Sequence, residues 1–430
     1  MLKASLLTFV ALLVNFTQVF HCVSIERSWK EGYLDISINA EEEMSLACTQ
    51  IRDIREPIYE VSFEEFSSSS KDLIKIFKVL REVQAEYGQI SFSSCYLGPA
   101  EQEEFILLMP KVKELIFYTT YGSLSKIIAA LPESKKLSML HLPDYELSEE
   151  EIKNVSSFLQ ESKAIKEIEL INPSGNPSFS QVFTALGSNP HLYEITFYRM
   201  RLSLKDVEAF ISALECRTLE KVLMIEWVRV RAPREALEKF VEFQQKGNIS
   251  LCIENLYQSS PPIKQDTFIK MLDNQLKFKD DAVFKCTNCG LSETFSAEFS
   301  KRLLESPPKK LKVRLQDNEM NFKSIAAICD AFETVGDKMD EFSVRLDGGY
   351  ALSDEEYDML LEKDYVVSEY NLMKSEKKAI YVDTKMKRGL LTMLGLNPDD
   401  ERNKKKKNKA NSLVTSKSFA LLLLLFFILQ

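Results

Sequence analysis

A short apolar motif recurs along the chain about every 28 residues, and this repetition constrains the fold more than any other feature. Each copy has an apolar residue, two variable residues, a second apolar residue, one variable residue and a third apolar residue. The third apolar residues of eleven copies are Phe63, Phe92, Phe117, Leu142, Leu170, Phe197, Met224, Ile253, Cys286, Leu315 and Leu346. Such alternation is typical of a strand with one buried face. The repetition predicts stacked structural repeats.

The second half of each copy has the pattern of a helix. In residues 202–214 the apolar side chains keep the i, i+3, i+4, i+7 spacing of one buried helical stripe. They are Leu204, Val207, Phe210, Ile211 and Leu214. Ser148 with Glu151, and Ser353 with Glu356, have the spacing of capping boxes at helix starts. Each copy therefore predicts a strand, a turn, a helix and a second turn.

This unit resembles the leucine-rich repeat in its ribonuclease-inhibitor-like form, over residues 57–373. In that family an Asn or Cys follows the third apolar residue by three positions, and a Leu follows it by five. The copies that keep this pattern have Cys95 with Leu97, Cys289 with Leu291, and Asn318 with Met320. The resemblance implies an α/β solenoid, a horseshoe of about eleven repeats with parallel strands on the concave face and helices on the convex face. Residues 25–56 and 374–400 would cap its two ends.

The beginning of the chain has the pattern of a secretory signal peptide. Within residues 1–24, Lys3 supplies a positive charge and residues 6–14 are apolar. An uncleaved anchor is the alternative. Export would make Asn154 and Asn248 acceptors for N-glycosylation, because each begins an Asn-x-Ser sequence. We therefore expect a secreted glycoprotein.

The end of the chain is apolar over residues 419–430, about half the length of a membrane-spanning helix. The basic and polar residues 401–418 before it predict a disordered stalk and spacer. This order resembles a GPI-attachment signal, whose tail is exchanged for lipid. It predicts a protein anchored on the extracellular face of the cell membrane, and a tail-anchored helix is the alternative. The candidate attachment residues are Asn408, Ala410 and Asn411.

Outward positions of the predicted strands indicate where a partner would bind. Side chains alternate along a strand, so the variable positions point away from the core. In the middle copies these positions form an expected exposed apolar and aromatic stripe, and such stripes mark interaction sites. Its residues are Ile116, Tyr118, His141, Ile171, Tyr198, Arg199, Leu223 and Ile225. A register error of one residue is the alternative, and it would exchange the two faces.

Composition narrows the function classes. The formal net charge is −9 and the chain has three histidines. We expect no nucleic-acid partner, because phosphate contacts need clustered Lys and Arg.

Cys286 and Cys289 have the spacing of half a zinc site or of a redox pair, but both fall on repeat positions that we expect to be buried. The sequence has no nucleophile, base and acid arranged as a catalytic site. We expect no catalytic residues, no metal and no cofactor.

These observations predict a non-enzymatic recognition or adhesion module. Its partner would be a protein or a glycan bound by the concave face, and the GPI lipid would attach it to the membrane. A structural component of a cell wall or coat is a second interpretation. A secreted hydrolase in an unrecognised fold is a third.

Overall fold

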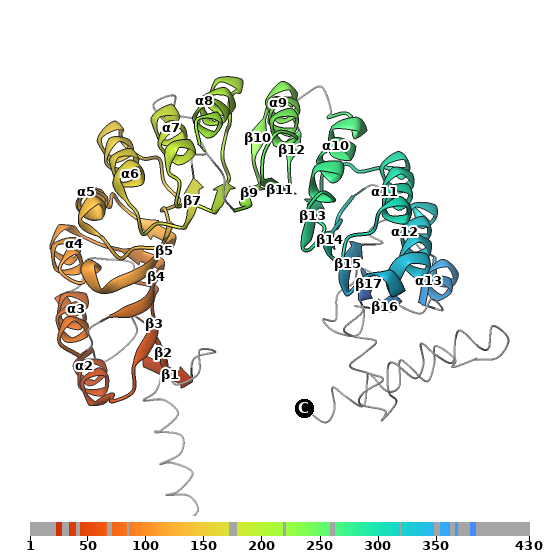
Figure 1. Cartoon of the computed structure of the whole chain (residues 1–430). Helices are drawn as coiled ribbons and strands as arrows, with labels where there is room; N and C mark the ends of the chain where they lie inside the picture. The colour runs from red at the N-terminus through yellow and green to blue at the C-terminus, as the bar shows by residue number, and fades with distance from the viewer. Residues whose placement is uncertain are drawn as a thin grey trace, which may run out of the picture. The chain divides into compact units, whose positions relative to one another are not determined.

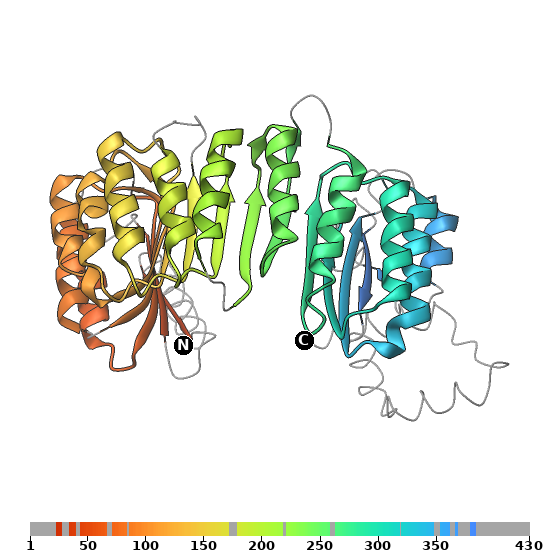
Figure 2. The ribbon, with the colours of Figure 1, turned by 45° about the horizontal axis from the view of Figure 1, so that its top comes forward.

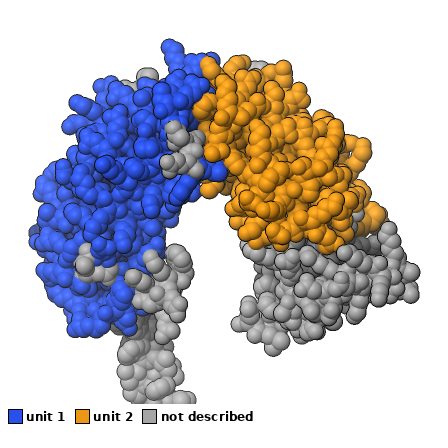
Figure 3. Space-filling view, viewed as in Figure 1, with its two compact units in different colours: residues 1–223 blue, residues 224–430 orange. Residues whose placement is uncertain are grey.

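The computed structural model describes most of the chain between residues 23 and 383. The described residues are 23–27, 34–39, 44–66, 71–83, 86–171, 179–217, 221–258, 263–318, 320–347, 353–361, 366–368 and 379–383. Residues 1–223 and 224–430 form two compact units, which Figure 3 shows in different colours. Parallel strands alternate with helices in both units. In the described residues the main sheet holds twelve parallel strands, seven in unit 1 and five in unit 2, in an open α/β fold, and a separate short sheet holds two more.

Unit 1 alternates strands and helices from residue 34 onward, after a first strand at residues 23–27. Its elements are β1 (Val23–Arg27), β2 (Leu34–Asn39), α2 (Met44–Asp53), β3 (Ile58–Glu64), α3 (Lys71–Val83), β4 (Tyr87–Tyr96), α4 (Pro99–Ile106), β5 (Val112–Tyr121), α5 (Ser125–Ala130), β6 (Met139–His141), α6 (Glu149–Glu161), β7 (Glu167–Ile171), α7 (Ser180–Ser188), β8 (Glu194–Tyr198) and α8 (Leu204–Glu215). Strand order follows chain order from β1 to β8. Strand β1 is antiparallel to β2, and the others are parallel. The helices lie side by side along one face of the strands (Figures 1 and 2).

The strands of unit 1 pair in the register that the periodicity predicts. Phe63 pairs with Phe92, which pairs with Phe117. Their buried rings stack, with centroids 5.1 and 5.4 Å apart and planes inclined by 12°. Phe77 of α3 and Phe105 of α4 contact the middle ring edge-on from the helices. The third apolar position therefore builds a phenylalanine stack through the core, and such ring pairs add to the stabilisation from buried area.

Unit 2 also alternates strands and helices, but its last strands include an antiparallel one. Its elements are β9 (Leu223–Val228), β10 (Arg231–Ala232), α9 (Arg234–Gln244), β11 (Ile249–Glu254), β12 (Tyr257–Gln258), α10 (Gln265–Gln275), β13 (Ala282–Thr287), α11 (Glu293–Glu305), β14 (Lys310–Arg314), α12 (Phe322–Val335), β15 (Glu341–Asp347), α13 (Asp354–Leu361), β16 (Val366–Ser368) and β17 (Ala379–Asp383). The strand order is β9, β11, β13, β14, β15, β17, β16. Strand β17 is antiparallel to both β15 and β16, so the run of parallel strands stops at β15.

One predicted strand of unit 2 has the wrong register. The periodicity assigned Met224 as a third apolar position, whereas Met224 is half-buried and Trp227 occupies the core. The error comes from residues 222–225, which are all apolar and give no alternation from which to choose a face. In the other copies of unit 2 the prediction holds, because Ile253 pairs with Cys286 across β11 and β13.

A left-handed residue lies at or near the end of the strand in seven of the copies. The residues with φ between 49° and 63° are Glu65, Ser94, Arg199, Arg229, Asn255, Asn288 and Asp317. Each follows the third apolar position by two residues, once Trp227 takes that position in β9. In four of the seven the N–H of this residue donates to a carbonyl of the next copy, as Asn255 does to the Thr287 carbonyl at 2.8 Å. Non-glycine residues adopt this conformation at a cost, so its recurrence at the same position is a feature of the repeat-like architecture.

A polar side chain joins neighbouring copies just beyond this turn. Asn318 is buried and accepts from the N–H groups of Cys289 and Leu291 at 2.9 and 3.2 Å. Its amide nitrogen donates to the Cys286 carbonyl at 2.7 Å. In unit 1 the equivalent Cys95 thiol donates to the Phe63 carbonyl at 3.3 Å. The residues that follow the third apolar position by three thus satisfy backbone groups that the turn leaves unpaired.

Candidate recognition surface on the strand faces

The predicted stripe divides into exposed and buried residues. Tyr118 is 55% exposed, and Arg199 is also exposed. Tyr198 and His141 are half-buried on the side of the strands opposite the core. The expected exposure was wrong for four residues. Ile116, Ile171, Leu223 and Ile225 are buried.

Two different causes bury these four side chains. Leu223 and Ile225 point into the core because the register of β9 differs from the predicted one by an odd number of residues, which exchanges the faces. Ile116 lies on the outward side, in register with His141, but Glu114 and Tyr118 flank it two residues away on the same strand. Longer neighbours can therefore cover an outward residue. Ile171 is likewise outward, in register with Tyr198.

The outward side of unit 1 carries a row of carboxylates that was not predicted from the sequence. The row lies at the variable position just before the second apolar residue of each copy. In register from β2 to β8 it comprises Asp35, Glu60, Gln89, Glu114, Met139, Glu167 and Glu194. All seven are half-buried. The sequence carried this signal, because the same position of the motif holds an acid in five of these strands.

Hydrogen bonds and pKa shifts indicate that these acids lie close together. Gln89 donates to the Glu60 carboxylate at 2.7 Å. Burial, followed by repulsion from the carboxylates of Asp35 and Glu114, raises the pKa of Glu60. Tyr59 donates to Glu114 at 3.3 Å, and burial together with that carboxylate raises the pKa of Tyr59 to about 12. The row is therefore a concentrated negative surface next to phenol groups.

A second phenol marks the other end of this row. Tyr193 donates to Glu167 at 2.5 Å, and this hydrogen bond is the largest cause that raises the pKa of Tyr193 to about 12. Burial and the charges of Glu167 and Glu194 act in the same direction. Tyr193 therefore stays a neutral hydrogen-bond donor at pH 7, and it holds the Glu167 carboxylate in place.

His141 is a neutral contact residue. Its Nδ1 atom lies 3.8 Å from Oε1 of Glu169, which neighbours it in register on β7. Burial lowers the pKa of His141 from 6.5 to about 4. The imidazole is therefore uncharged at pH 7, and its approach to Glu169 is not an ion pair there.

On the same side of unit 2, strands β13 to β15 carry a group of cations. Lys285, Arg314 and Arg345 lie in register on β13, β14 and β15. Lys285 is half-buried and pairs with Glu254 at 2.9 Å and Glu226 at 3.6 Å. Arg314 is exposed. We name the carboxylate row of unit 1 the acidic face, and the outward side of β13 to β15 the basic face.

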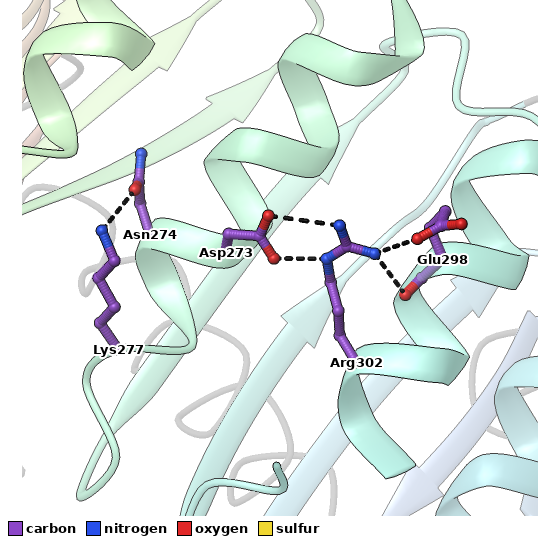
Figure 4. A network of polar contacts seen from close by, with 5 residues as sticks. All are labelled: Asp273, Asn274, Lys277, Glu298 and Arg302. Carbon is purple, nitrogen blue, oxygen red and sulfur yellow. Dashed lines mark hydrogen bonds and ion pairs between the residues drawn. The ribbon is translucent and has the colours of Figure 1, made fainter. Parts of the chain in front are cut away.

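Arg302 and Lys277, on the helix side of unit 2, form contacts that join structural elements (Figure 4). Arg302 of α11 contacts both carboxylate oxygens of Asp273 on α10, and it also pairs with Glu298 one turn earlier. Lys277 donates to the Asn274 side-chain oxygen at 3.1 Å. This arrangement ties neighbouring helices together and leaves the Arg302 guanidinium little capacity for a ligand.

The cysteine pair lies in the core of unit 2. Cys286 and Cys289 are both fully buried. Burial, followed by the neighbouring Cys289, raises the pKa of the Cys286 thiol, and burial raises the pKa of Cys252 to about 12. The thiols of Cys286 and Cys252 are therefore protonated at pH 7 and are poor nucleophiles and ligands. Across the described residues no group of three or more His, Cys, Asp or Glu side chains is arranged to hold a metal ion.

The residues expected to carry modifications are partly described. Asn154 is half-buried in α6, and Asn248 is exposed in the turn before β11. Asn408, Ala410 and Asn411 lie outside the described residues, as do residues 1–22 and the apolar tail. Within the described part of the chain, no helix has the length and apolarity needed to span a membrane. Comparisons of the chain with known protein families and with curated proteins give no match.

Proposed function

We propose that the chain is a leucine-rich-repeat-type solenoid, a horseshoe with its strands on the concave side, that binds a protein partner without catalysis. We infer that it is secreted and held by a GPI lipid on the extracellular face of the cell membrane. The recurring left-handed turn and the buried Asn318 contacts support the repeat. The signal-peptide and GPI patterns of the two ends support the location.

The observation that carries the recognition function is the exposed Tyr118 beside the acidic face. An aromatic side chain that is 55% exposed provides apolar contact area at a low cost in conformational entropy. Half-buried carboxylates of the acidic face are held by Gln89, Tyr59 and Tyr193, so they need little ordering when a partner binds. Held acids next to exposed aromatic area fit a protein surface that presents both cations and apolar groups.

A binding experiment with matched variants tests this function. The full chain, multimerised on a fluorescent carrier, is titrated onto cells of its source, and bound fluorescence is measured by cytometry. Tyr118→Ala combined with Tyr198→Ala is expected to reduce binding about tenfold or more, since aromatic anchors dominate interface energies. Leu107→Ala, at an exposed residue after α4, is the control and is expected to bind as the unaltered chain does. Equal binding by all three proteins would contradict the proposal.

A separate measurement tests the attachment. Cells displaying the full chain are treated with a phosphatidylinositol-specific lipase, and the released protein is quantified. The proposal expects release of a soluble chain that lacks residues 419–430. Release only by denaturant would favour a wall or coat component, and a retained tail would show that no GPI lipid is attached.

A further inference from the structure

The basic face of unit 2 includes cations that form no ion pair with the described residues. Strand β14 alternates exposed and buried residues, so Lys310, Lys312 and Arg314 share the side opposite the core. Neither Lys312 nor Arg314 forms an ion pair with any described residue, whereas Lys285 next to them is held by two carboxylates. Cations left unpaired on a sheet face contribute little to folding but remain available to a partner.

Arg345 of β15 extends this group sideways. It lies in register with Arg314 on the adjacent strand, and strands in a sheet are about 4.8 Å apart. The Gln316 side-chain amide, with its oxygen toward Arg345, accepts from Nε at 2.9 Å. This contact orients the guanidinium next to that of Arg314. Two adjacent guanidinium groups suit a carboxylate, which each can bind in a bidentate manner.

The spacing along β14 identifies the kind of anion that fits. Side chains two residues apart on a strand are about 6.6 Å apart, so Lys310, Lys312 and Arg314 form an evenly spaced line. Alternate side chains of a partner peptide in extended conformation have this same spacing. We propose that the basic face binds an extended acidic segment of a partner protein, with carboxylates at alternate positions, laid along β14. This rests on the proposed function, because it assigns a partner chemistry to the strand face of unit 2.

A densely charged polyanion fits this face less well. Glu341 pairs in register with Lys310, so one end of the line has a compensating acid. The chain as a whole carries a net charge of −9, which repels a polymer with a charge on every unit. A short peptide with three spaced carboxylates avoids most of this repulsion. The matched periodicity therefore favours a peptide over a sulfated glycan.

Fluorescence anisotropy with three probes tests this inference on the full chain. One labelled peptide alternates Glu and Ser over three Glu residues, the second has the same composition with the three Glu in a block, and the third probe is a sulfated oligosaccharide. We expect the alternating peptide to bind about fivefold more tightly than the block peptide at low salt, and to weaken as salt rises. Equal affinity for both peptides would overturn the inference, and binding of the oligosaccharide alone would replace it with a glycan partner.

Charge-reversal variants locate the site. Lys312→Glu combined with Arg314→Glu is expected to lower affinity for the alternating peptide about tenfold or more. Lys270→Glu combined with Lys301→Glu makes the same charge change at exposed residues of α10 and α11, and is expected to change affinity less than twofold. Equal losses in both variants would assign the binding to overall charge and overturn the site. Tyr118→Ala with Tyr198→Ala should leave peptide binding intact, so failure here is distinguishable from failure of the proposed function.

Discussion

Both units alternate strands and helices in a repeat-like way, but the acidic face of unit 1 and the basic face of unit 2 differ in charge. In unit 1 the outward row holds acids such as Glu60, Glu114 and Glu167, whereas in unit 2 Lys312 and Arg314 take outward positions. The buried positions of both units stay apolar. The repeat is therefore maintained by the apolar positions, and the variable positions are free to differ. A negatively charged surface and a positively charged surface on one chain can bind two partners or two parts of one partner.

The cores of the units also differ in what joins their copies. Unit 1 stacks the rings of Phe63, Phe92 and Phe117, and it has a thiol at Cys95. Unit 2 relies on the amide of Asn318 for several backbone contacts. We expect the stability of unit 1 to depend more on ring packing, and the stability of unit 2 to depend more on the side chain of Asn318.

The largest expected effect on stability comes from removing one of the stacked rings. Phe92→Ala removes a fully buried ring between two others and should lower the free energy of unfolding by about 3 to 5 kcal/mol. Urea denaturation followed by circular dichroism measures this change. Tyr121→Ala, at an exposed ring of the next strand, is the control and should cost less than about 0.5 kcal/mol. Similar costs for the two variants would refute the ring stack.

The second effect concerns the polar contacts of unit 2. Asn318→Ala leaves the N–H groups of Cys289 and Leu291 without their acceptor, and should cost about 2 to 4 kcal/mol. Cys95→Ala in unit 1 removes one weak donor and should cost about 1 kcal/mol. Chemical denaturation of both variants under identical conditions compares them. A larger loss for Cys95→Ala would reverse the contrast between the units.

The third effect depends on pH. Burial lowers the pKa of His141 to about 4, so below pH 6.5 the unfolded chain binds a proton that the folded chain does not. The stability linked to His141 is complete above pH 6.5 and declines as the pH falls toward 4. Between pH 7 and 4.5 the unaltered chain should lose about 1 to 2 kcal/mol more than His141→Gln. Denaturation curves of both proteins are measured at the two pH values. An equal loss of stability in the two proteins would contradict the burial of the imidazole.

The smallest effect tests repulsion within the acidic face. A raised pKa means that the folded state disfavours ionised Glu60, so its contribution to stability is present below the unfolded pKa and is lost as the pH rises through the folded pKa. Glu60→Gln keeps an acceptor for Gln89 and should gain a few tenths of a kcal/mol at pH 7. The gain should vanish near pH 3. Glu133→Gln, at an exposed residue, is the control, and thermal unfolding at the two pH values measures both.

Much of the fold could be predicted from periodicity because a buried position repeats its chemistry. Phe63, Phe92 and Phe117 were assigned from spacing alone and pair in register. The assignment failed where residues 222–225 are all apolar, because local alternation no longer separates the two faces. Trp227 is recognised as the core residue through the left-handed turn at Arg229, which sequence does not reveal for a residue such as Arg.

The recognition surface was harder to predict because exposure depends on neighbours. Tyr118 is exposed as expected, but Ile116 on the same strand is covered. That outcome depends on side chains brought together by pairing. The acids at Glu114 and Glu167 were visible in the sequence, but their proximity follows from strand register. Residue types can therefore be read directly, whereas their grouping needs the structure.

Hydroxyl-radical footprinting of the full chain on the cells that it binds tests most directly whether the strand face is the recognition surface. Oxidation of Tyr118 and of Leu107, both about half exposed in unit 1, is measured by mass spectrometry with and without cells. The strand-face account predicts that binding protects Tyr118 strongly and leaves Leu107, beside the helices, unchanged. Protection of Leu107 with continued oxidation of Tyr118 would contradict it.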